Sequence, residues 1–160
     1  MTVIITVVIV LIAQWWLDLL NAPHFPSSST LTTVNVKAYW DASHANEIKA
    51  INWGTVYLGS SYNTTIFLQS ISNVRTTFEL TTENWTFLNS HGGIVLGPLK
   101  ETSYLNLSWD CDKRNVNPKE TVQVTLTLNV ADSTDFKSFL VEGDVKGFSV
   151  DIVIRAVEST

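Results

Sequence analysis

The sequence predicts an all-β protein: an antiparallel β-sandwich, immunoglobulin-like or jelly-roll-like, preceded by one N-terminal hydrophobic segment. Two observations support this prediction. From Leu31 onward apolar and polar residues alternate with a period of two, as in half-buried strands, and no long helical pattern occurs. Seven or eight such stretches, separated by turns rich in Gly, Asn and Pro, follow one another at the spacing of a sandwich.

The chain opens with its most hydrophobic segment, residues 1–20. Val3 to Ala13 carries no charge, and Thr6 is its only polar side chain. Three interpretations fit. The first is a cleaved signal peptide, whose apolar core needs about 7–15 residues. Here, however, no Lys or Arg precedes the core, and the site before Pro23 is poor for cleavage.

A membrane anchor is the second interpretation, because Thr2 to Leu20 spans 19 residues and a spanning helix needs roughly 20. Trp15 and Trp16 would then lie at the interface, with Asp18 at its aqueous edge. The third is a strand, since Val and Ile favour β-structure. Being apolar on both faces, it would need burial on both, for instance in a partner subunit. Each interpretation places the rest of the chain outside the cytoplasm.

The next residues, Asn21 to Thr30, contain two prolines and a serine run without periodicity, so we expect a linker there. The sandwich domain is expected over residues 31–160. Strands are expected at 32–40, 48–54, 64–72, 75–82, 104–109, 121–130 and 148–157, with a further short one near Ile94. Residues 131–140 predict a helical turn capped by Ser133 or Asp132.

Charge and cysteine content exclude some classes of partner. The charged fraction is 16%, well below the roughly 25% usual for soluble domains. The net charge is -5 and there is no basic run, so nothing in the sequence favours binding to nucleic acid. Cys111 is the only cysteine, which excludes an intrachain disulfide. A quiet thiol is favoured over one that pairs between chains.

Three triplets fit the N-glycosylation pattern Asn-x-Ser/Thr, beginning at Asn63, Asn84 and Asn106. Asn106 falls on the outward face of its expected strand, Asn63 precedes an expected strand and Asn84 follows another. All three are therefore expected to be exposed, as attachment of a glycan requires. We predict that at least one of them is glycosylated if the chain is exported.

The tryptophans have two interpretations. Exposed aromatic rings stack on sugars, so a carbohydrate-binding module is one. The alternation instead places Trp40, Trp53 and Trp109 inward, which favours packing between two sheets. By the same alternation Tyr39 and Tyr104 are expected at the surface.

No pattern in the sequence predicts a catalytic, cofactor or metal site. The histidines, His24, His44 and His91, are scattered without zinc spacing. Asp41 with Glu47, and Asp110 with Asp112, share loops, but neither loop has the run of ligands typical of a calcium loop. No Gly-x-Ser-x-Gly elbow or phosphate-binding loop occurs. We therefore expect a protein that is not an enzyme and has no cofactor.

The stretch "INWGTVYLGSSYNTTIFLQSISNVRTTFELTTENW", followed by "LNLSWD", "VNPKETVQVTLTLNV" and "FSVDIVI", resembles a family of archaeal exported β-sandwich proteins. The resemblance covers about Val34 to Val157. In outline the chain is also similar to subunits of archaeal threads and bundling pili, which have an N-terminal signal peptide and a glycosylated sandwich. The resemblance implies polymerisation by donation of an N-terminal strand, from the segment before the first sandwich strand or from "LTTVNVKAYW".

These observations lead to two main hypotheses. The first is a non-enzymatic extracellular structural protein, a subunit of a cell-surface filament or biofilm matrix that binds other copies of itself. The second is a sandwich held at the cell surface by a single transmembrane helix, as a binding or accessory module of an envelope complex. A carbohydrate-binding module is a third.

Overall fold

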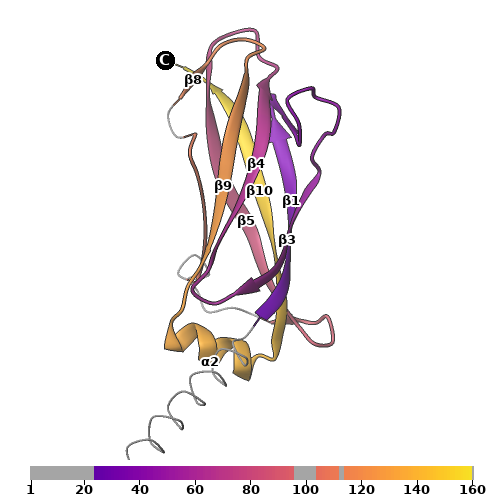
Figure 1. Ribbon diagram of the computed structural model, residues 1–160, viewed down its shortest axis with the longest axis vertical. Helices are drawn as coiled ribbons and strands as arrows, with labels where there is room; N and C mark the ends of the chain where they lie inside the picture. The colour runs from indigo at the N-terminus through magenta and orange to yellow at the C-terminus, as the bar shows by residue number, and fades with distance from the viewer. Residues whose placement is uncertain (1–23, 96–103, 112–113, 160) are drawn as a thin grey trace, which may run out of the picture.

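Two β-sheets pack face to face to form an all-β sandwich in the computed structural model, which describes residues 24–95, 104–111 and 114–159 (Figure 1). Sheet A has the order β3-β1-β10-β5-β6, with β8 also pairing with β5, and sheet B has the order β2-β4-β9-β7. Sheet A contains β1 (His24–Val34), β3 (Ala50–Tyr57), β5 (Thr76–Asn89), β6 (Ile94–Val95), β8 (Asn115–Val116) and β10 (Val145–Glu158). Sheet B contains β2 (Val36–Tyr39), β4 (Ser61–Ser70), β7 (Leu105–Trp109) and β9 (Thr121–Val130).

The two strands with the most regular alternation form the middle of the sandwich. β9 buries all five of its apolar inward residues, Val122, Val124, Leu126, Leu128 and Val130, as predicted. β10 likewise buries Phe148, Val150, Ile152 and Ile154. Each strand has a neighbour on both sides, so its inward face is covered by the opposite sheet and its edges by hydrogen-bonded partners.

The linker expected at Asn21 to Thr30 is wrong from His24 onward, where β1 begins. β1 lies between β10, with which it is parallel, and β3, with which it is antiparallel. Its buried residues include Ser27 and Ser29, whose hydroxyls have partners in the core. Ser27 Oγ donates to the carbonyl of Gly54 at 3.1 Å, and Ser29 Oγ accepts from Trp53 Nε1 at 2.8 Å.

The single strand expected at 32–40 is divided by a corner at Asn35, which has φ of 58°. Before the corner the chain belongs to sheet A and after it to sheet B. The corner breaks the alternation that placed Val34 inward, and Trp40 lies just beyond the end of β2; both are 42% exposed. Tyr39, expected at the surface, is buried instead. The alternation is correct for Trp53, which is buried, whereas Trp109 is partly buried against the core.

The predicted helical turn is a helix, α2 (Thr134–Glu142), and Ser133 caps it by accepting a hydrogen bond from the Phe136 N–H. α2 lies at one end of the sandwich, which we call the base, beside the start of β1 and the β3–β4 and β5–β6 turns (Figure 1). The opposite end, which we call the apex, contains the β4–β5 turn, β8 and the end of β10. At the base the ring of Tyr104, expected at the surface, stacks on Phe136 at 4.6 Å.

The hydrogen bond between Ser29 and Trp53 yields a stability prediction. Ser29→Ala leaves the indole N–H buried without its acceptor, so the free energy of unfolding should fall by about 1–3 kcal/mol. Ser28→Ala is the matched control, because Ser28 is the exposed neighbour on the same strand; its effect should stay within about 0.5 kcal/mol. Urea unfolding measures both, and equal effects would contradict the prediction.

Candidate interaction surfaces and modification sites

The outer face of sheet B consists mainly of uncharged polar side chains, with Lys37 and Phe67 as exceptions, and carries two of the predicted glycosylation sites. Asn63 on β4 pairs with Thr127 on β9, and Asn106 on β7 pairs with Asn129 on the same strand. Both asparagines are exposed, as predicted. The remaining outward residues of β9 are Gln123 and Thr125. A glycan on either asparagine would extend from this face without meeting the core.

Asn84 is also exposed, but its side chain has a structural role. It lies in a bulge where the β5–β10 register shifts, and its φ of 51° is in the left-handed region that Asn tolerates better than most residues. Its Nδ2 donates to Asp151 Oδ2 at 2.8 Å. Thr30 Oγ1 donates to the other oxygen of Asp151, so one carboxylate joins β1, β10 and β5. These hydrogen bonds, first that from Thr30, hold the pKa of Asp151 below its ordinary value.

Glycosylation is testable site by site. Asn63→Gln and Asn106→Gln should each increase the gel mobility of the exported protein by one step, because each removes one attachment site. For the third site we choose Thr86→Ala, which abolishes the triplet and leaves the Asn84–Asp151 hydrogen bond intact. Unchanged mobility in all three variants, together with an intact mass equal to that of the bare chain, would rule out glycosylation.

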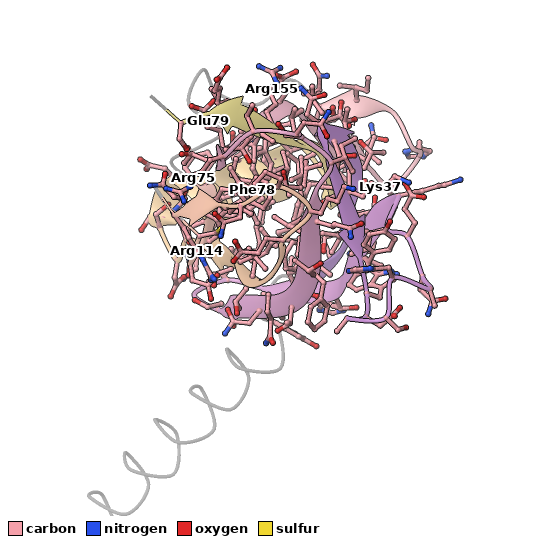
Figure 2. The ribbon with its side chains drawn as sticks, turned by 90° about the horizontal axis from the view of Figure 1, so that it is seen from above. Lys37, Arg75, Phe78, Glu79, Arg114 and Arg155 are labelled. Atoms are coloured by element: carbon pink, nitrogen blue, oxygen red, sulfur yellow. The ribbon has the colours of Figure 1, made fainter. Side chains whose placement is uncertain are left out.

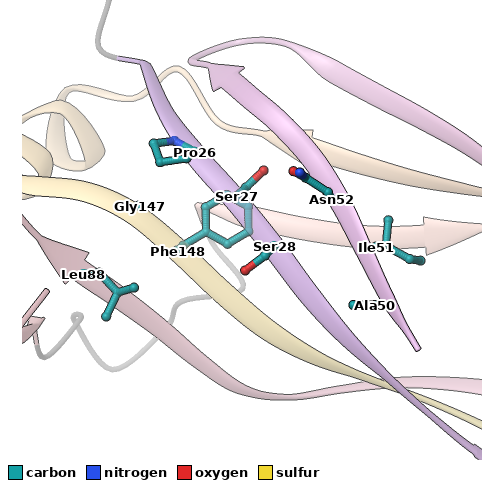
Figure 3. Close-up of a pocket in the computed structure, with 9 residues that line it drawn as sticks. All are labelled: Pro26, Ser27, Ser28, Ala50, Ile51, Asn52, Leu88, Gly147 and Phe148. Atoms are coloured by element: carbon teal, nitrogen blue, oxygen red, sulfur yellow. The ribbon is translucent and has the colours of Figure 1, made fainter. Parts of the chain in front are cut away.

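An open groove of 370 Å³ lies on sheet A, where β1, β3, β10 and β5 come together (Figure 3). Gly147 has no side chain to fill it, and Pro26 and Leu88 lie among its lining residues. Ser28 and Asn52 supply polar groups. None of its nine lining residues is titratable at ordinary pH, so the groove offers no general acid or base.

The loop from Asp41 to Glu47 is organised around the Asp41 carboxylate. This carboxylate accepts hydrogen bonds from the Ser43 hydroxyl, the backbone N–H groups of Ala45 and Asn46, and the Asn46 side chain. They lower its pKa from 3.8 to about 2, the Ser43 hydroxyl contributing most. The carboxylate is thus occupied by its own loop. Within the described ranges no group of three or more His, Cys, Asp or Glu side chains is arranged to hold a metal ion.

The lowered pKa of Asp41 predicts a pH dependence. Because the folded-state pKa lies below the unfolded value, the charged carboxylate stabilises the fold above pH 3.8, and this contribution is lost as the pH falls toward about 2. Asp41→Ala should therefore lower the melting temperature at neutral pH, and its difference from the wild type should shrink between these two pH values. A difference that stays constant through this window would contradict the assignment.

The histidines and cysteine are dispersed, as the sequence predicts. His44 Nε2 is 2.9 Å from Thr121 Oγ1, and its ring contacts Tyr39 beside sheet B. His91 is in the β5–β6 turn and His24 begins β1 at the base. Cys111 is buried. Asp110 accepts a hydrogen bond from the Thr125 N–H, and its expected neighbour Asp112 lies outside the described residues.

The outer edge of β5 is the surface that sequence reasoning missed. β8 pairs with β5 at Thr76 and Thr77, and β6 pairs with it at Phe87 and Leu88. Between them, Phe78 to Thr86 pairs with β10 on one side and with no described strand on the other. Unpaired N–H and C=O groups along a strand edge are a template for another strand. Local alternation does not reveal which strand is an edge, so the sequence contained no pattern for it.

Comparison of the sequence with protein-family models and with curated proteins finds no match. The resemblance to archaeal exported sandwich proteins therefore stays a prediction. Among the described residues, which begin at His24, no helix is long and apolar enough to cross a bilayer. The hydrophobic segment at residues 1–20 lies outside them.

Proposed function

We propose that this protein is a non-enzymatic structural subunit of an extracellular, cell-surface filament, with an immunoglobulin-like or jelly-roll-like sandwich that binds other copies of itself. The observation that carries the proposal is the open edge of β5. It extends over the nine residues Phe78 to Thr86, or about 30 Å of strand. The apolar run from Val3 to Ala13 is long enough to cover it as an added strand.

The direction of the chain supports this pairing. β5 runs from the apex to the base, and β1 starts at the base. A segment that leaves the base of one copy and enters the next copy at its apex would lie antiparallel to β5. Antiparallel pairing is the arrangement that β5 already has with β10, β6 and β8. Only Asn21 to Pro23 separates Leu20 from β1, so the two copies would be held close together.

Of the two donors considered, the segment before His24 is the better supported. The other, "LTTVNVKAYW", begins within β1, which is hydrogen-bonded on both sides in its own sheet, and includes the whole of β2. Removing it from its own subunit would break the pairing of Leu31 to Val34 with β10 and the pairing of β2 with β4. Donation through residues 1–20 leaves every described strand in place.

The proposed pairing is testable by disulfide cross-linking in the full-length chain with Cys111→Ala. Thr81→Cys is placed on the β5 edge, and cysteine is introduced in turn from Ile4 to Val10. Strand pairing should give cross-linked ladders at every second position, because alternate side chains share a face. Efficiencies with a period near 3.6, or no ladder, would reject strand donation at this edge.

A second test of strand donation removes the proposed donor segment, Thr2 to Leu20. The shortened chain should retain the far-ultraviolet circular dichroism and melting temperature of the sandwich but should sediment as a monomer. Filaments of unchanged length after truncation would be evidence against the proposal.

A membrane-anchored binding or accessory module is the second candidate, favoured by the 19 residues from Thr2 to Leu20 and the short connection to β1. It predicts a retained Met1 in the intact mass and a protein that resists extraction from membranes by alkaline carbonate. A carbohydrate-binding module has less support, because among the four described tryptophans only Trp40 is exposed, at 42%, and a sugar platform needs more than one exposed ring.

A further inference from the structure

The exposed apolar side chains lie mainly at the two ends of the sandwich. Among the described residues eight large hydrophobic side chains are exposed, and seven of them are at the apex or the base. The apical four are Val34, Ile71, Val74 and Val157, and the basal three are Tyr57, Ile94 and Val141. Isolated exposed hydrophobics are ordinary, but a concentration at opposite ends of one molecule is typical of surfaces that are covered in an assembly.

Hydrogen bonds between the apical segments hold the four apical residues in one region. The Ile71 N–H donates to the Asn35 carbonyl, next to Val34. The Ser159 N–H donates to the Arg75 carbonyl, which brings the end of β10 to the β4–β5 turn. Val34 and Val157 both point outward from sheet A, on neighbouring strands. The apical patch thus belongs to a fixed part of the fold.

At the base the two most exposed residues lie on α2 and β6. Val141 is 74% exposed and Ile94 is 70% exposed. Gly143, which follows α2, is so close to Val95 that a Cβ at Gly143 would lie 2.9 Å from its side chain. Ser90 in the adjoining turn donates a hydrogen bond to Asp144. The helix and the β5–β6 hairpin therefore form one surface.

The apex carries an excess of positive charge. Its charged side chains are Lys37, Arg75, Arg114, Lys119 and Arg155, with Glu79, Glu120 and Glu158. These five basic and three acidic groups give +2, and the adjoining loop, which His44 joins to Thr121 at 2.9 Å, adds Asp41, Glu47 and Lys49 for a net charge of +1. Figure 2, a view onto this end, shows four of the cations spread around the rim, with the buried Phe78 nearer the middle. Lys37 and Arg75 have no acidic partner among the described residues.

The base carries an excess of negative charge. Its charged groups are Asp132, Asp135, Glu142 and Asp144, with Lys137 and Lys146, for a net charge of -2. Both lysines are already paired, Lys137 with Asp132 at 2.6 Å and Lys146 with Asp144 at 3.0 Å. Asp135 and Glu142 remain without a basic partner in the described part of the chain.

We propose that copies of this chain stack end to end. The apex of one subunit, which is basic and has four exposed apolar side chains, would contact the base of the next, which is acidic and also has exposed apolar side chains. The partner is a second copy of the chain, because the two surfaces complement each other in charge and share an apolar component. A contact between unlike surfaces repeats without closing on itself and so builds a filament. The inference rests on the proposed function, since the donated segment also runs from base to apex. The end contact fixes orientation, and the added strand supplies most of the binding.

Charge reversal in the full-length protein tests the electrostatic part. Glu142→Lys at the base and Arg75→Glu at the apex should each raise the critical concentration for assembly about 3–10-fold at low salt. The double variant should assemble at close to the wild-type concentration, because the reversed charges face each other again. Thr65→Glu, at an exposed position in the middle of β4, is the control and should have little effect. Loss without rescue in the double variant would overturn the end contact.

A cross-linking experiment tests the contact without requiring long filaments. Full-length chains with Cys111→Ala carry a single cysteine at Ile71 on the apex or at Val141 on the base. A short bismaleimide should join the apical variant to the basal one and should join neither to itself. Equal cross-linking of like ends, or none at all, would overturn the inference. Ladders at the β5 edge without apex–base cross-links would refute the stacking and leave the proposed filament intact.

Apolar substitutions complete the test. Val141→Ser removes the most exposed hydrophobic side chain at the base and should weaken assembly without changing the melting temperature. Thr65→Ser, at an exposed position in the middle of β4, is its control. An equal effect of the two substitutions would contradict a role for the ends.

Discussion

The position of β1 between β3 and β10 is the constraint on which the rest of the sandwich depends. Within the described chain, β3 is joined to sheet A through β1 alone. β1 also holds eight consecutive residues in parallel register with β10. Ser27 and Ser29 point inward from β1 and are small, so they leave room for the large rings of Trp53 and Phe148. Ser27 donates a hydrogen bond to the Gly54 carbonyl, and Ser29 accepts one from Trp53. Sheet A is therefore held together partly by hydroxyl groups inside its core.

The corner at Asn35 helps to give the sandwich two structurally different ends. Asn35, at positive φ, is the one residue between β1 in sheet A and β2 in sheet B. The corner therefore fixes which sheet each of the two strands joins. Because β1 rises from base to apex, the N-terminal segment is joined at the base, whereas the last strand ends at the apex. Polarity along the long axis is a requirement for any assembly that repeats in one direction.

The sequence predicted those parts of the fold in which local pattern and final environment agree. β9 alternates cleanly because only one of its faces is covered, whereas β10 also buries Val153 on its other face. Ser133 caps α2 through a bond to a residue three positions away. β1 was missed because buried serines and two nearby prolines have the composition of a linker, and their compensating partners, Gly54 and Trp53, are distant in sequence. Exposure at Asn106 followed from alternation. Asn63 and Asn84 are exposed as expected, but within β4 and β5 instead of outside strands, and the bond from Asn84 to Asp151 was not predicted. The β5 edge and the charges at the two ends depend on strand order, which no local pattern encodes.

The charge at the base also bears on the choice between a filament subunit and an anchored module. With three residues between Leu20 and β1, a spanning helix would hold the base within about 10 Å of the membrane surface. That distance is close to the Debye length of about 8 Å at physiological ionic strength. Asp135 and Glu142 would therefore gain nothing from neutral head groups on the outer leaflet, and anionic ones would repel them. Against the apex of another copy the same two carboxylates would meet uncompensated cations, Lys37 and Arg75 among them. The base is thus better matched to a second subunit than to an anionic bilayer, which favours the filament.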